Sequence, residues 1–155
     1  MNTPLHFLIN YLVIQLFLKN ANEYLLPIAF FSMILDLDHI KYWWVNRKKV
    51  KQILFSEGVD FKSRSAAHEL IGFGLIVLIG VFGFLYANDK LLVVIIVSCL
   101  CLHILLDFLT GSARPFYPFS GKVVKSPFYI EKWRNRVIFE AVLTIFMGFI
   151  FYSKW

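Results

Sequence analysis

Apolar residues fall into five runs along the chain, and polar connections separate them. The runs cover about residues 4–18, 24–37, 70–87, 91–109 and 137–152. A membrane-spanning helix needs about 20 mostly apolar residues, with a range of about 17–25, so the third and fourth runs are long enough. The other three are shorter, and they would span by recruiting flanking aromatic and basic residues or would lie partly inside a bundle. The pattern predicts an all-α integral membrane bundle of about five transmembrane helices.

Composition supports a membrane protein. Hydrophobic residues make up 59% of the 155 residues, against roughly 45–50% in a soluble domain. No repeat, linker or low-complexity run divides the chain, so we expect a single domain over residues 1–155. We expect the first run to be a retained helix, because Met1–Thr3 contains no basic residue and no small-x-small cleavage site follows.

Lysine and arginine are distributed unevenly between the connections. The connections at about 38–69 and 110–136 contain thirteen of the sixteen basic residues. The positive-inside rule therefore predicts that they face the cytoplasm. Anionic lipid explains the net charge of +6, so no nucleic-acid partner is expected. Residues 42–55 have the mixed character of an interfacial amphipathic helix, although a solvated positively charged loop fits them as well.

Ionisable side chains gather near one predicted membrane boundary, at the cytoplasmic leaflet. Each run or its flank offers a pair of polar residues three or four positions apart, which lie on the same face of a helix. The pairs are His6 with Asn10, Asp36 with His39, Arg64 with His68, His103 with Asp107, and Arg136 with Glu140. Ionisable groups within a bilayer face the bundle interior and find partners there. Five pairs at one depth therefore predict a shared polar cavity.

The residue types in this layer favour metal binding. Imidazoles and carboxylates without thiolates suit zinc, manganese, iron or a related divalent ion, and several aspartates favour more than one ion. Paired metals can polarise a phosphoryl oxygen and activate water, and Arg64 is placed to clamp phosphate oxygens. Each residue also has a simpler interpretation, because an isolated histidine near a helix end is more often an interfacial residue. Asp36 and Asp38 could also simply end a helix.

Three motifs resemble the YdjM-type, LexA-regulated family of membrane-bound metal-dependent hydrolases. They are LDLDHIK (35–41), SRSAAHEL (63–70) and LHILLDFLTGSARPFYPFS (102–120), and the resemblance covers about residues 6–140. The Asp-x-Asp-His element of the family falls on Asp36, Asp38 and His39. Its His-x-x-x-Asp element falls on His103 and Asp107.

The third family element, His-Arg-x-x-x-His-Ser, falls on Ser63, Arg64, His68 and Glu69. Ser63 here replaces a histidine and Glu69 replaces a serine, which puts a ligand at position 63 in doubt and offers a replacement carboxylate at 69. An early family histidine corresponds to His6, and a glutamate in the last helix corresponds to Glu140.

The residues and the resemblance together predict a metal-dependent phosphoester hydrolase in the inner membrane, with its site facing the cytoplasm. One to three divalent ions are expected, zinc first, with manganese or iron as alternatives. The expected ligands are His6, Asp36, Asp38, His39, His68, Glu69, His103 and Asp107. The expected catalytic residues are Asp38 or Glu140 as general base and Arg64 as phosphoryl stabiliser.

The expected substrate is a phospholipid, lipid phosphate or polyprenyl phosphate, because a site at the leaflet boundary can reach a lipid head group. Residues 110–122 are either a lid over that substrate, with Arg114 toward the head group, or an ordinary aromatic surface loop. A divalent-metal binding or transport protein without hydrolytic activity is the main alternative function. A bis-histidine haem protein is a further alternative.

Overall fold

The computed structural model describes residues 2–45, 47–49, 65–126, 128–130 and 133–154, and most of them are helical. The helices are α1 (Thr3–Phe17), α2 (Leu25–Met33), α3 (Leu37–Val45), α6 (Leu70–Tyr86), α7 (Lys90–Thr110) and α8 (Trp133–Lys154). Short 3-10 turns are η1 (Ala21–Tyr24), η2 (Ile34–Asp36), η3 (Arg47–Lys49) and η4 (Ala66–His68). A two-residue strand β1 (Ser112–Ala113) pairs antiparallel with β2 (Val124–Lys125). The predicted all-α fold is confirmed apart from this small ribbon.

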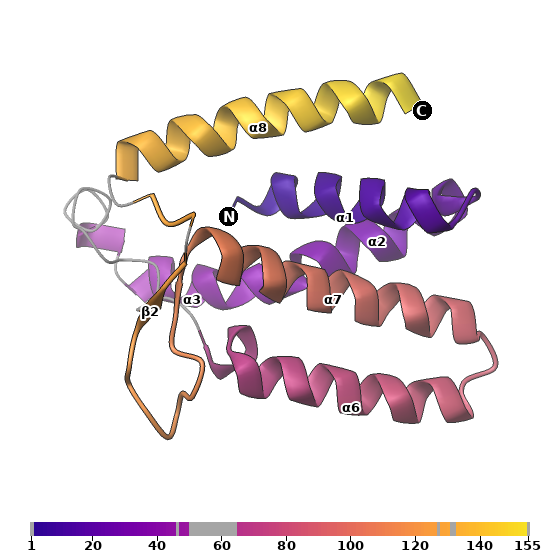
Figure 1. Ribbon diagram of the computed structural model, residues 1–155, viewed down its shortest axis with the longest axis horizontal. Coiled ribbons are helices and arrows are strands. Elements are labelled where there is room, and N and C mark those ends of the chain that lie inside the picture. The colour runs from indigo at the N-terminus through magenta and orange to yellow at the C-terminus, as the bar shows by residue number, and fades with distance from the viewer. Residues whose placement is uncertain (1, 46, 50–64, 127, 131–132, 155) are drawn as a thin grey trace.

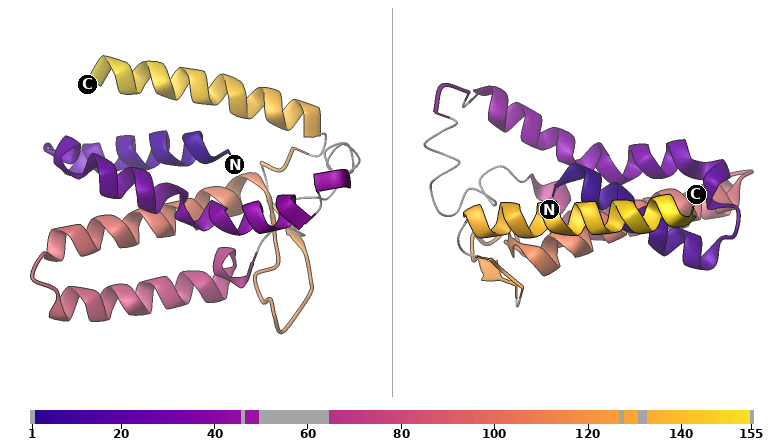
Figure 2. Two further views of the ribbon diagram at one scale, coloured as in Figure 1. Left: turned by 180° about the vertical axis from the view of Figure 1, so that it is seen from behind. Right: turned by 90° about the horizontal axis from the view of Figure 1, so that it is seen from above.

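The long helices lie side by side in one layer, in the order α8, α1, α7 and α6 (Figure 1). Helices α2 and α3 run across one face of this layer, where α2 packs against both α1 and α7 (Figure 2). Because chain direction alternates, the N-terminal ends of α1, α6 and α8 and the C-terminal ends of α2 and α7 meet at the same end of the bundle. This arrangement brings the polar ends of the apolar runs together.

Side-chain caps fix where two of these helices begin. The Asn2 side chain accepts a hydrogen bond from the Leu5 backbone N–H at 2.9 Å and so caps α1. The amide of Asn2 also donates to the Thr144 hydroxyl of α8 at 3.2 Å. Asp89 caps α7 by accepting from the Leu92 N–H at 2.9 Å. The two caps therefore set the start of α1 and of α7. The contact between Asn2 and Thr144 sets the register of α1 against α8.

Within the described residues, two helical segments are long and apolar enough to cross a membrane, Lys90–Thr110 and Asn135–Ser153. Thr3–Phe17 and Leu70–Tyr86 are apolar but shorter. The buried core lies where α1, α2 and α7 meet, and its members are Tyr11, Ile14, Ala21, Ile28, Ile95 and Cys99. By contrast, α6 and α8 expose large apolar side chains along most of their length. Such a continuous apolar exterior is typical of a surface in contact with lipid.

The second apolar run differs from the uninterrupted segment predicted over 24–37. Helix α2 ends at Met33, the chain tightens into η2, and α3 then continues to Val45. The Leu37 N–H shares its hydrogen bond between the carbonyls of Ile34 and Leu35, as expected for a tightened turn. The tight turn ends at Asp36, which faces α7. Of the predicted interfacial helix over 42–55, only the first part lies in α3 and η3, and residues 50–55 lie outside the described residues.

We predict that Gly72→Ala destabilises the protein and that Gly74→Ala does not. A Cβ at Gly72 would lie 2.0 Å from the carbonyl oxygen of Ala67, whereas a Cβ at Gly74 would have no atom within 4 Å. The first change forces η4 away from α6, with an expected cost of about 1–3 kcal/mol. The second should be neutral or stabilising by up to about 1 kcal/mol. Thermal unfolding of the two variants in the same detergent tests this, and equal melting temperatures would contradict the packing.

Candidate metal centre

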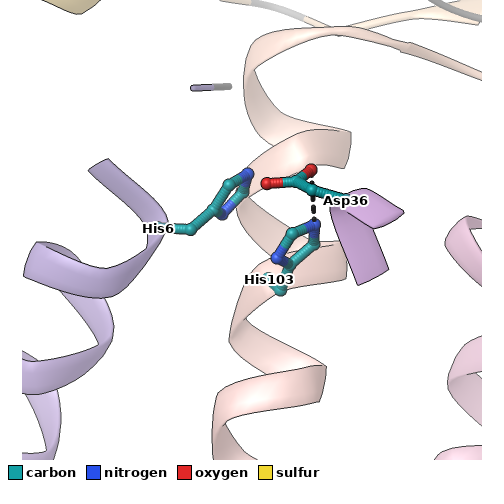
Figure 3. Close-up of side chains that lie close together, drawn as sticks. All are labelled: His6, Asp36 and His103. Carbon is teal, nitrogen blue, oxygen red and sulfur yellow. Dashed lines mark ion pairs between the residues drawn. The ribbon is translucent and has the colours of Figure 1, made fainter. Parts of the chain in front are cut away.

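Four histidines and two aspartates converge at the shared end of the bundle. They come from five elements of the chain: His6 on α1, Asp36 in η2, His39 on α3, His68 in η4, and His103 with Asp107 on α7. Figure 3 shows that His6, Asp36 and His103 point toward one another from three of these elements. The predicted shared polar cluster is therefore present for these six residues.

The geometry of His103 assigns its proton. Its Nδ1 lies 2.7 Å from the carbonyl oxygen of Ser32, so Nδ1 donates a hydrogen bond to that oxygen. Its Nε2 lies 3.5 Å from the Asp36 Oδ1 (Figure 3) and makes no hydrogen bond to any described residue. The imidazole is fully buried. A histidine that donates from one nitrogen to a backbone carbonyl is held with its other nitrogen ready to bind a metal ion.

His6 faces the second carboxylate. Its Nε2 lies 3.2 Å from the Asp107 Oδ1, and its ring stacks on the His103 ring at a centroid distance of 3.7 Å and an interplanar angle of 10°. Two stacked imidazolium rings this close would repel each other, so protonation of both rings is a poor way to balance the two carboxylates. A divalent cation would balance both negative charges and leave the rings neutral.

His39 and His68 extend the cluster on the side of Asp36. His39 Nε2 lies 4.0 Å from the Asp36 Oδ1, and the rings of His39 and His68 stack at 5.3 Å. His68 also lies 5.3 Å, between ring centroids, from His103. His39 is the most open of these ligand candidates, with a side chain 25% exposed, whereas the Asp36 side chain is 10% exposed.

In the part of the chain that the structure describes, three overlapping groups of side chains could each hold a metal ion, because their ligand atoms lie within 4.8 Å of one another. The groups are His6–Asp36–His103, Asp36–His39–His68 and His68–His103–Asp107. Two zinc ligands with bonds of about 2.0–2.1 Å lie about 3.4 Å apart in tetrahedral geometry. The 3.5 Å between His103 Nε2 and the Asp36 Oδ1, within the first group, matches that spacing. The donor set also suits manganese or iron, and the overlap leaves room for more than one ion.

A polar layer behind the cluster holds it in place, and its centre is Ser32. The Ser32 carbonyl accepts from His103, and the Ser32 hydroxyl accepts from the Asn10 amide at 2.8 Å. The same amide donates to the Cys99 carbonyl at 3.2 Å. Asn10, predicted from its spacing to share the cavity with His6, therefore joins α1, α2 and α7 behind the histidines. Ser32 was missed from the sequence, because a lone serine in an apolar run carries no distinguishing signal.

Glu69 lies beside the cluster and binds the loop after α7. Its Oε2 accepts from the Arg114 backbone N–H at 2.8 Å, and its Oε1 lies 3.7 Å from the Arg114 Nε. The guanidinium of Arg114 also lies over the ring of Tyr117, 4.1 Å from its centroid. Glu69 belongs to none of the three groups found among the described residues. Its position indicates that it holds Arg114 at the edge of the site.

The remaining predicted site residues are not brought into the cluster by the described structure. Glu140 accepts from the Arg136 Nε at 3.0 Å within α8, and it belongs to none of the three groups among the described residues. Arg64 and Ser63 lie outside the described residues, as does the side chain of Asp38. Their predicted roles stay predictions.

The chain matches one family model along its whole length. The model is described as YdjM inner membrane protein, and it matches residues 1–155. Comparison with curated proteins finds no match, and comparison with solved structures finds none either.

Proposed function

We propose that this chain, which belongs to the YdjM inner membrane protein family, is a metal-dependent hydrolase that cleaves a phosphate ester of a membrane lipid. One observation carries the proposal: the buried end of a membrane bundle holds four histidines and two aspartates in three overlapping groups with metal-binding spacing. A buried cluster of this kind adds little to stability by itself, so a functional role explains it better.

The described residues have separate tasks in this proposal. His6, Asp36, His103 and Asp107 would hold the first ion, and His39 and His68 would extend the site toward a second. A divalent ion bound there would supply an electrophile for a phosphoryl oxygen and an acidified water. The Ser32 carbonyl orients the His103 ring, which leaves Nε2 facing Asp36 and available as a metal ligand.

Arginine side chains neutralise the negative charge of the phosphate in this proposal. Arg114 lies at the edge of the site, held by Glu69, and a guanidinium can bind phosphate oxygens through two hydrogen bonds. Arg64 is the second candidate, one helical turn before His68 in the sequence. Asp38 or Glu140 would act as general base, as the sequence motifs suggest.

Hydrolysis is favoured over ion transport by where the polar residues lie. A transporter is expected to place polar groups along a path through the membrane. Helix α6 contains no Asp, Glu, Lys, Arg or His between Leu70 and Tyr86, and α7 contains none between Lys90 and His103. The cluster therefore lies at one end of the helices, where it can reach a head group.

Phosphate release from defined lipids tests the proposed function. Metal-loaded protein in nanodiscs is expected to release phosphate or a phosphorylated head group from at least one member of a panel of phosphatidate, phospholipids and polyprenyl phosphates. Chelation should abolish this turnover, and added zinc or manganese should restore it, since the ion supplies the electrophile. Metal-loaded protein that turns over no phosphorylated lipid in the panel would contradict the proposal.

A further inference from the structure

We infer that an apolar groove along α7 binds the hydrocarbon chain of the lipid whose phosphorylated head group lies at the metal centre. The inference rests on the proposed function and names how its substrate is held. Its occupant is a lipid chain, and three features of the groove argue for it: its position next to a cavity that contacts the metal cluster, its length and the charge at one end.

The groove is a cavity of about 560 Å³ between α1, α6 and α7. Residues of α7 line it from Leu91 to Leu105, and the end of α1 and Phe73 of α6 complete its walls. Ser98 and Cys101 are its most polar lining residues, and no charged residue lines it. Such a surface can bind hydrocarbon but offers nothing to a polar ligand.

A second cavity lies next to the groove on the side of the metal cluster. It measures about 220 Å³, and Phe73 and Leu105 line both cavities. His68 and Glu69 also line the second cavity, and His68 belongs to two of the three metal-binding groups. Apolar side chains of α7 and α6 therefore border both the groove and a cavity that contacts a candidate metal ligand.

The length of the groove fits one extended hydrocarbon chain. The fourteen-residue step from Leu91 to Leu105 spans about 21 Å of helix, longer than the roughly 15 Å of hydrocarbon in one leaflet. The cavity of about 560 Å³ along this step therefore leaves room for a chain that lies parallel to α7.

Charge at the cluster end of the groove matches an amphiphile with an anionic head. At the cluster end, Ala113 and Pro115 line the smaller cavity on either side of Arg114, whose side chain is 17% exposed. Arg114 and a bound divalent ion would both attract a phosphate there. A lipid with its head at that end would have its chain parallel to α7, as lipid chains lie in a bilayer.

Photo-cross-linking tests the groove without depending on turnover. A lipid phosphate with a diazirine near the end of its chain is reconstituted with the metal-loaded protein in nanodiscs, irradiated and mapped by mass spectrometry. We expect labelling of residues 91–105 and 13–18, at least about tenfold reduced by excess unlabelled lipid phosphate and unaffected by its dephosphorylated form. Labelling that is equal on α8, or that either lipid reduces equally, would overturn the inference.

A groove-filling variant separates this inference from the proposed function. Val94 lines the groove far from His103 and is 45% exposed, and Ile145 on α8 is 74% exposed and serves as the matched control. Val94→Trp should retain wild-type metal content, lose at least about fivefold of the specific labelling, and hydrolyse a long-chain lipid phosphate at least about tenfold more slowly. It should hydrolyse a short-chain ester at the wild-type rate. Ile145→Trp should hydrolyse both the long-chain and the short-chain substrate at the wild-type rate.

The outcomes separate the groove from the proposed function. A wild-type protein that hydrolyses neither ester refutes the function, while specific labelling that is lost in Val94→Trp would still support the groove. Unchanged labelling in Val94→Trp refutes the groove alone.

Discussion

Asp36→Asn is expected to remove at least about 90% of the divalent metal that copurifies with the wild-type protein. Asp36 is the carboxylate shared by two of the three groups, His6–Asp36–His103 and Asp36–His39–His68. The amide keeps the size of the side chain but removes the negative charge that balances the ion, so both groups weaken together. Loss of even an outer-shell partner lowers metal affinity by about 10–100-fold, and loss of a shared ligand should exceed that. Elemental analysis of metal per chain, after purification without chelators, measures the result.

Glu140→Gln is the matched control for Asp36→Asn. Both changes replace a carboxylate by its amide, and the two side chains are similarly accessible, at 12% and 10% exposed. Glu140 pairs with Arg136 and lies outside the three groups among the described residues, so Glu140→Gln should retain wild-type metal. Retention of metal in Asp36→Asn would refute the central position of Asp36. Equal loss in both variants would indicate a global effect on folding.

The sequence could predict which residues converge, because alternating helix direction places the ends of successive apolar runs at one boundary. His6, Asp36, His39, His68, His103 and Asp107 were all predicted to share a layer, and the structure brings these six together. Depth follows from position along an apolar run. The depth of a residue can therefore be read from its position in the sequence, without knowing how the helices are rotated about their axes.

Partners within one element were predictable from spacing, as for Arg136 with Glu140 and Asp36 with His39. Partners on different elements could not be predicted, since they depend on helix rotation and crossing. His103 and Asp107 were paired from their spacing of four, and they do share one metal-binding group with His68. The sequence did not show that His103 also reaches Asp36 and that Asp107 reaches His6, on other elements. Helix spacing shows only that both side chains share a face, and the packing of α1 and η2 decides what meets that face. The contact between Glu69 and Arg114 is hidden for the same reason, because it depends on how the loop after α7 folds back.

His103→Ala is expected to lower the turnover of a phosphorylated lipid by at least about 10³-fold, whereas His39→Ala should lower it by about 10–100-fold. His103 is fully buried, belongs to two metal-binding groups and is oriented by the Ser32 carbonyl. His39 belongs to one group, is 25% exposed and lies 4.0 Å from Asp36. A thousandfold loss corresponds to about 4 kcal/mol of transition-state stabilisation, within the range of several kcal/mol that a metal ion supplies.

Metal titration distinguishes these two variants by mechanism. Excess zinc or manganese should restore much of the His39→Ala rate, because the groups that contain His103 remain complete and only the outer ion is weakened. The same titration should leave His103→Ala inactive, because two groups have lost the ligand that lies between Asp36 and the stacked His6 ring. Rescue of His103→Ala by added metal would indicate that the catalytic ion binds on the His39 side of Asp36. Full activity of His103→Ala without added metal would show that the cluster has no role in catalysis.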